Sequence, residues 1–165
     1  MADEKTRAVF FDRDGTIMHD VNYCSDPKDV HVFPVVADSL RKLKAREFKL
    51  IMVTNQSGIG RGYFTWEQYR RVHAEVLRQL GEPLIDATYV CPDVPGSDSK
   101  CRKPAPGMIH DLMQHWPVRR DGSFIIGDRP SDIEAAEAAG LPGFLFAGGD
   151  LDAFVADVMA QTRVR

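Results

Sequence analysis

The 165-residue sequence is defined first by what it lacks. It has no apolar run that approaches the length of a membrane span, so we expect no membrane partner. Its formal net charge is −3, and without an excess of basic residues we expect no nucleic-acid partner. It has only three cysteines, and this odd number argues against a disulfide framework. Residues 1–5 are polar and lack the apolar core of a secretion signal, which predicts a cytoplasmic protein.

The length suits one domain, residues 1–165, and no repeat or linker divides it. Strand-like and helix-like segments alternate, which predicts an α/β fold with a central parallel sheet and helices on both faces. We expect strands at 8–11, 49–53, 87–90, 124–126 and 144–146, and helices at 34–43, 65–80, 107–115, 131–139 and 151–162. The segments at 19–33, 54–63 and 91–106 are expected to be irregular loops.

Polar side chains recur where the expected strands end. Asp12 and Asp14 follow the first strand, Thr54 and Asn55 follow the second, and Asp128 follows the fourth. Parallel strands place these ends along one edge of the sheet, where open α/β folds bind ligands. Two carboxylates one residue apart repel each other unless a cation relieves them, and Mg²⁺ with oxygen ligands suits such a site.

Each of these residues also has an ordinary structural interpretation. Asp12 to Gly15 and Asp128 to Pro130 have turn composition, and Thr54 has the chemistry of a helix N-cap. Lys103 is of a type that is usually solvated at the surface. Asp132 has the position of an acid that complements the dipole of the following helix.

Four separated segments together resemble the haloacid dehalogenase (HAD) superfamily of phosphohydrolases. In chain order they are Asp12-Arg13-Asp14-Gly15-Thr16, Thr54-Asn55, Arg102-Lys103-Pro104 and Gly127-Asp128-Arg129-Pro130-Ser131-Asp132. The resemblance implies a three-layer Rossmann-like fold, and the short gaps between the motifs imply that it has no cap domain. The segments at 54–62 and 101–108 are similar to those of the capless heptose 1,7-bisphosphate 7-phosphatases and histidinol-phosphate phosphatases.

By this resemblance, Asp12 is the nucleophile that forms an aspartyl-phosphate. Asp14 is the general acid and base of the two half-reactions. Asp12, Asp128 and the Asp14 backbone carbonyl are the expected Mg²⁺ ligands. Thr54 and Lys103 are expected to contact the phosphoryl group, and Asp132 to orient Lys103 or hold a metal-bound water.

The expected substrate is a small phosphorylated sugar, most favourably a heptose 1,7-bisphosphate. Asn55, Ser57, Arg61 and Arg102 are the candidate substrate contacts, because arginine forks suit phosphate and sugar hydroxyls. The segment that includes Asn22 and Tyr23 is a candidate pocket wall. We expect a monomer, because a capless site needs no partner to complete it.

The sequence departs from these relatives in one loop, where they carry four zinc ligands. The corresponding positions are Cys91, Asp93, Ser99 and Cys101, so only two of the four expected ligands remain. Structural zinc needs four good nitrogen or sulfur donors, and we therefore expect no bound zinc. Prolines 92, 95 and 104 and local hydrogen bonds are expected to hold the loop instead.

Other functions compete with this interpretation. The alternative substrates are histidinol phosphate, another metabolite, or a nucleic-acid 3′-phosphate. A non-hydrolytic phosphoryl receiver also uses Asp, Thr, Lys and Mg²⁺ on a parallel sheet, but there the phosphorylated Asp follows a later strand. A catalytically inactive binding protein is disfavoured because all the core catalytic positions are intact.

Overall fold

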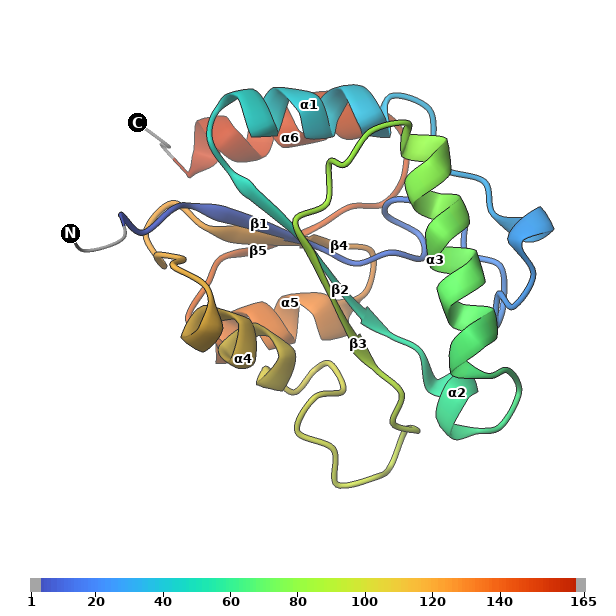
Figure 1. The fold of residues 1–165 in the computed structure, drawn as a ribbon. Coiled ribbons are helices and arrows are strands. Elements are labelled where there is room, and N and C mark those ends of the chain that lie inside the picture. The colour runs from blue at the N-terminus through green and yellow to red at the C-terminus, as the bar shows by residue number, and fades with distance from the viewer. Residues whose placement is uncertain (1–3, 163–165) are drawn as a thin grey trace.

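The computed structural model describes residues 4–162 and has a parallel sheet between two layers of helices (Figure 1). The five strands are β1 (Ala8–Phe11), β2 (Lys49–Asn55), β3 (Ala87–Cys91), β4 (Phe124–Gly127) and β5 (Gly143–Leu145). The α-helices are α1 (Val36–Ala45), α2 (Ser57–Gly60), α3 (Trp66–Leu80), α4 (Gly107–His115), α5 (Pro130–Ala138) and α6 (Leu151–Gln161), with a 3₁₀ turn at Pro27–Asp29. The predicted α/β class and three-layer arrangement are confirmed.

The strand order is β3-β2-β1-β4-β5, and every neighbouring pair is parallel. The chain therefore builds outwards from β1 to β3, then crosses back to place β4 on the other side of β1. The point where the direction reverses lies between β1 and β4, and crevices at such points are where α/β sheets bind ligands. No cap domain is inserted between the elements of residues 4–162.

The strands are apolar on both faces because helices cover both. Val9, Phe11, Leu50 and Met52 face one core with α1, α3 and α6. Phe10, Ile51 and other residues on the alternate positions face a second core with α4 and α5. All four residues of β1 are fully buried, so the central strand is held from both sides.

The helices begin and end close to their expected positions. A capping box starts α3, with reciprocal bonds between Thr65 and Gln68. The expected loop after β2 contains a helix that the sequence analysis missed, α2. Gly58 permits this turn, since a Cβ there would lie 2.1 Å from the Phe64 ring. No helix among the described residues combines the length and the apolar character that crossing a membrane requires.

Candidate active site

Asp12 and Asp128 lie at the reversal point of the sheet. Asp12 follows β1, and its backbone N–H donates to Ile126 O at 3.1 Å, which extends the pairing with β4. Asp128 follows β4 directly. Gly15 makes room for it, because a Cβ at this residue would lie 2.2 Å from Asp128 Oδ2 and its φ is +83°. The turn after β1 therefore closes against the turn after β4, and the two carboxylates share one crevice.

Lys103 is buried at the centre of this crevice, although it lies far from both aspartates in the sequence. Its Nζ donates to Asp12 Oδ1 at 3.0 Å, to Asp132 Oδ1 at 2.6 Å and to Val53 O at 2.8 Å. These three bonds use all the hydrogens of an ammonium group. Burial acts to lower the pKa of Lys103, but the two carboxylates raise it above its ordinary value. The solvated-surface interpretation of Lys103 is therefore wrong.

Three carboxylates of this crevice form a group that can hold a cation. Asp12, Asp128 and Asp132 each bring an oxygen within 4.8 Å of the others. Asp128 Oδ1 is buried and has no hydrogen-bond partner among residues 4–162. Burial raises the pKa of Asp12 to about 8; the charge of Asp132 also raises this pKa, whereas the charge of Lys103 lowers it. Burial also raises the pKa of Asp128. An all-oxygen set with an unpaired buried oxygen fits Mg²⁺, whose charge would favour the ionised carboxylates.

Asp132 contacts both the start of α5 and Lys103. Its Oδ2 accepts the backbone N–H of Arg129 at 3.1 Å, which caps the start of α5. Its Oδ1 accepts from Lys103 at 2.6 Å, and Asp132 is only 2 % exposed. The helix start therefore fixes a carboxylate that in turn orients the lysine.

The end of β2 supplies Thr54 and Asn55 to the same edge. Thr54 is fully buried and is not a helix N-cap, since Gln56 precedes α2. The Asn55 side chain donates to Lys103 O at 3.1 Å and accepts from Lys103 N at 3.0 Å. This amide, expected to contact substrate, is thus paired with the backbone that carries the buried lysine.

A cavity of about 710 Å³ opens above these groups. Asp12, Asp14 and Lys103 lie at its floor, and the predicted contacts Ser57, Arg61 and Arg102 line it, together with Asn22 and Tyr23 from the expected wall and with Arg129. Arg129 was not among the expected contacts, although it directly follows Asp128 in the quoted motif.

The arginines of the cavity are close enough to affect one another. Burial lowers the pKa of Arg102, and the positive charges of Arg61 and Arg129 lower it further. Arg129 has an acidic partner, since its Nη2 lies 3.0 Å from Asp20 Oδ2. Among residues 4–162, the Arg102 guanidinium has one hydrogen-bond partner, the Asp93 carbonyl oxygen, which lies 3.3 Å from its Nη1. This wall of the cavity therefore attracts anionic groups.

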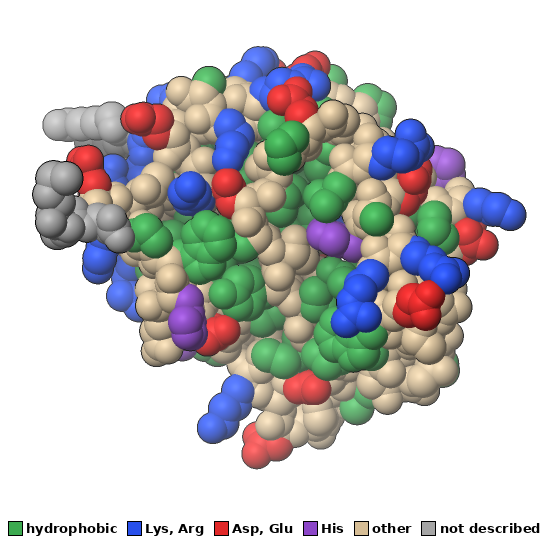
Figure 2. Space-filling view, in the orientation of Figure 1, with side chains coloured by type: hydrophobic (Ala, Val, Ile, Leu, Met, Phe, Trp, Pro, Cys, Tyr) green, Lys and Arg blue, Asp and Glu red, His purple; other side chains and the backbone are tan. Residues whose placement is uncertain are grey.

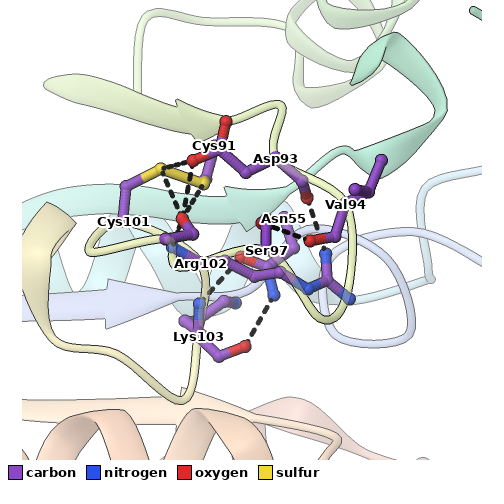
Figure 3. The surroundings of a disulfide bond; sticks show 9 residues. Asn55, Cys91, Asp93, Val94, Ser97, Cys101, Arg102 and Lys103 are labelled. Carbon is purple, nitrogen blue, oxygen red and sulfur yellow. Dashed lines mark hydrogen bonds between the residues drawn. A yellow bond between two sulfur atoms is a disulfide. The ribbon is translucent and has the colours of Figure 1, made fainter. Parts of the chain in front are cut away.

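The loop before Arg102 is closed by a disulfide between Cys91 and Cys101 (Figure 3). The expectation from the odd cysteine count was wrong, because β3 and the returning loop bring two Cα atoms to 5.6 Å and leave Cys24 free. Ser99 Oγ donates to Asp93 Oδ2 at 2.6 Å and accepts from Arg102 N at 3.0 Å. Zinc binds cysteine as the thiolate, and the two sulfurs joined in the disulfide are not thiolates, so this loop does not suit a zinc ion. The absence of zinc stays a prediction.

Comparisons with known proteins agree with this geometry. The family model described as polynucleotide kinase 3 phosphatase matches residues 7–140. A D-glycero-beta-D-manno-heptose-1,7-bisphosphate 7-phosphatase of Rhodopseudomonas palustris is 40% identical over 93% of this chain and 91% of its own. A D-glycero-alpha-D-manno-heptose-1,7-bisphosphate 7-phosphatase of Photorhabdus laumondii is 34% identical over 86% of this chain and 82% of its own.

A solved structure is also similar over nearly the whole length. It is the D,D-heptose 1,7-bisphosphate phosphatase from B. bronchiseptica complexed with magnesium and phosphate. The TM-score is 0.84 at 25% sequence identity, and the match covers 94% of this chain and 99% of that one.

Proposed function

The chain belongs to the HAD-like phosphatases of the polynucleotide kinase 3 phosphatase family, and we propose that it removes the 7-phosphate from a D-glycero-D-manno-heptose 1,7-bisphosphate. The observation that carries this proposal is the pairing of two features in one cavity. A carboxylate nucleophile with a buried lysine lies at the floor, and a group of arginines lines the wall. A substrate with two phosphates can use both.

The proposed reaction gives separate roles to Asp12 and Asp14. In the first step Asp12 attacks phosphorus, the bond from phosphorus to the sugar oxygen breaks, and Asp14 gives that oxygen a proton. In the second step Asp14 takes a proton from water as the water oxygen displaces Asp12 from phosphorus. The products are the sugar alcohol group and inorganic phosphate, and both aspartates return to their starting state.

The charge of the reacting groups is balanced by the crevice. Asp12, Asp128 and the Asp14 carbonyl would hold Mg²⁺, which neutralises phosphoryl and carboxylate charge when bound. Lys103 places a second positive charge 3.0 Å from Asp12 Oδ1. Thr54 Oγ1 supplies a hydroxyl donor at the end of β2. These groups are positioned before substrate arrives, which is what stabilises a transition state efficiently.

The arginines favour the bisphosphate over the alternative substrates. The positive charge of Arg61 lowers the pKa of Arg102, and a second phosphate bound beside Arg102 would relieve this repulsion. Histidinol phosphate carries an ammonium group, which this wall would repel. On the face shown in Figure 2, basic and acidic side chains are interspersed, which suits a small substrate better than a polynucleotide.

A substrate comparison tests the proposal. We expect Mg²⁺-dependent hydrolysis of heptose 1,7-bisphosphate, with a kcat/KM at least about tenfold above that for heptose 7-phosphate. Heptose 7-phosphate lacks the second phosphate and therefore loses the charge-assisted contact of that phosphate with the arginines. The panel includes both anomers, histidinol phosphate and a 3′-phosphorylated oligonucleotide. A higher kcat/KM for either of the last two would contradict the assignment.

We expect the protein to act as a monomer in the cytoplasm, without nucleic acid or membrane as a partner. A disulfide is more usual in oxidising compartments, so the state of Cys91 and Cys101 in freshly lysed cells bears directly on the expected location.

A further inference from the structure

Gln56 connects two groups that the proposed mechanism uses for different purposes. Its Nε2 lies 2.8 Å from Thr54 Oγ1 and 3.1 Å from Asp14 Oδ2. The side chain is only 5 % exposed, and it lines the catalytic cavity. An amide NH₂ carries two hydrogens, so Gln56 can donate to both oxygens at once.

The bond to Thr54 determines what the threonine hydroxyl can do. Because Thr54 Oγ1 accepts a hydrogen from Gln56, its own hydrogen is free to be donated elsewhere. In the proposed mechanism, a phosphoryl oxygen accepts that hydrogen. Without Gln56, the same hydroxyl would be free to rotate.

The Asp14 carboxylate accepts hydrogen bonds from two residues, Gln56 and Arg13. Arg13 Nε lies 2.9 Å from Asp14 Oδ1, and Arg13 Nη2 lies 3.3 Å from Asp14 Oδ2. Arg13 is fully buried, with its guanidinium 5.7 Å from the centre of the Tyr69 ring. Arg13 belongs to the same turn as Asp14, whereas Gln56 comes from the loop after β2. Gln56 is therefore the contact that ties Asp14 to the neighbouring strand.

We propose that Gln56 is a positioning residue for phosphate hydrolysis, which fixes the Asp14 carboxylate beside the leaving oxygen and aims the Thr54 hydroxyl at the phosphoryl group. This inference rests on the proposed function, since it requires Asp14 to donate the proton in the first step. Gln56 itself touches neither substrate nor cation in this scheme. Its effect on the rate passes through the two residues to which it donates.

The test compares two substrates that differ in how much they need a proton donor. An alkyl phosphate has a poor leaving group that needs a proton, whereas p-nitrophenyl phosphate has a leaving group that departs without one. The value of kcat/KM reports the steps up to departure of the leaving group. For Gln56→Met we expect kcat/KM to fall about tenfold more with the alkyl phosphate than with p-nitrophenyl phosphate.

The ratio of the two kcat/KM values does not depend on how much enzyme is folded, so partial unfolding of the variant does not obscure the result. Gln114→Met makes the same exchange on the exposed side of α4 and should leave the ratio at the wild-type value. Gln56→Glu, which loses the donor and adds a charge beside Asp14, should change the ratio at least as much as Gln56→Met.

Asp14→Asn separates failure of this inference from failure of the proposed function. If Asp14→Asn changes the ratio and Gln56→Met does not, Gln56 does not position the acid and the inference is overturned. If Asp14→Asn also leaves the ratio unchanged, the acid role of Asp14 is wrong, and with it the proposed mechanism. In the double variant Asp14→Asn/Gln56→Met the ratio should equal that of Asp14→Asn alone, because without the acid at position 14 the loss of Gln56 has nothing further to misplace.

Discussion

At the scale of single residues, the site depends on one buried cation surrounded by acceptors. Lys103 has three acceptors and is 4 % exposed, and two of those acceptors are carboxylates, one directly after β1 and one in the first turn of α5. Such a group is costly to bury and is stable only while its partners are present. The chemistry and the folding energy of this site are therefore linked through the same side chain.

Lys103→Met tests this link. It leaves Asp132 and Asp12 buried without their charged partner, and we expect the free energy of unfolding to fall by about 3–5 kcal/mol. Urea unfolding followed by circular dichroism measures the loss. Adding Asp132→Asn to this variant should recover part of the stability, since it removes one of the unpaired charges; no recovery would mean that the buried ion pair does not account for the loss.

Asp12→Asn tests the nucleophile separately from the fold. The amide keeps the shape of the carboxylate but cannot form the covalent intermediate, so turnover of p-nitrophenyl phosphate with Mg²⁺ should fall to background. The backbone bond from residue 12 to Ile126 does not involve the side chain, and the circular dichroism spectrum should be unchanged. Full activity in this variant would rule out Asp12 as the nucleophile.

At the scale of elements, the loop between β3 and α4 carries two residues of the site. Its disulfide joins Cys91 at the end of β3 to Cys101, one residue before Arg102. Asn55 pairs with the backbone of Lys103 at the other end of the same segment. The loop is therefore attached to β3 through Cys101 and to β2 through Lys103, and Arg102 lies between these two attachments (Figure 3).

Removing the disulfide should loosen this segment. A disulfide between cysteines with a sequence separation of 10 stabilises a fold by about 2–3 kcal/mol in the chain-entropy treatment. Cys101→Ser or reduction should therefore lower the unfolding free energy by that amount. We also expect a higher KM, because Arg102 is less well placed. Reductant should have no further effect on Cys91→Ser; an equal effect there would implicate another group.

At the scale of the whole molecule, the sequence predicted the elements better than the contacts between them. The five strands and the helices at 65–80 and 107–115 were found because their apolar patterns and capping residues are local signals. The helix α2 was missed because Gly58 and Gly60 disfavour a helix in isolation, and only packing against Phe64 explains the turn.

The same distinction applies to the site. Asp12, Asp128 and Lys103 were found from motifs, and strand order then explains why residues so distant in sequence meet. Gln56 and Arg13 were not assigned a role, since a glutamine in a loop and an arginine between two aspartates both suggest solvated side chains. Both side chains are buried because the turn after β1 packs against the residues that follow β2, and the sequence near either residue does not indicate this contact.

The lack of an inserted cap among residues 4–162 has a consequence for the fate of the intermediate. Asp12 lines a cavity that no inserted domain of residues 4–162 covers, so molecules from solution can enter beside a phosphoryl group held there. Water is the most abundant acceptor, but glycerol or another small alcohol that enters from solution can compete for the same phosphorus. Such an enzyme would divide its product between free phosphate and new phosphate esters, in proportion to the alcohol present.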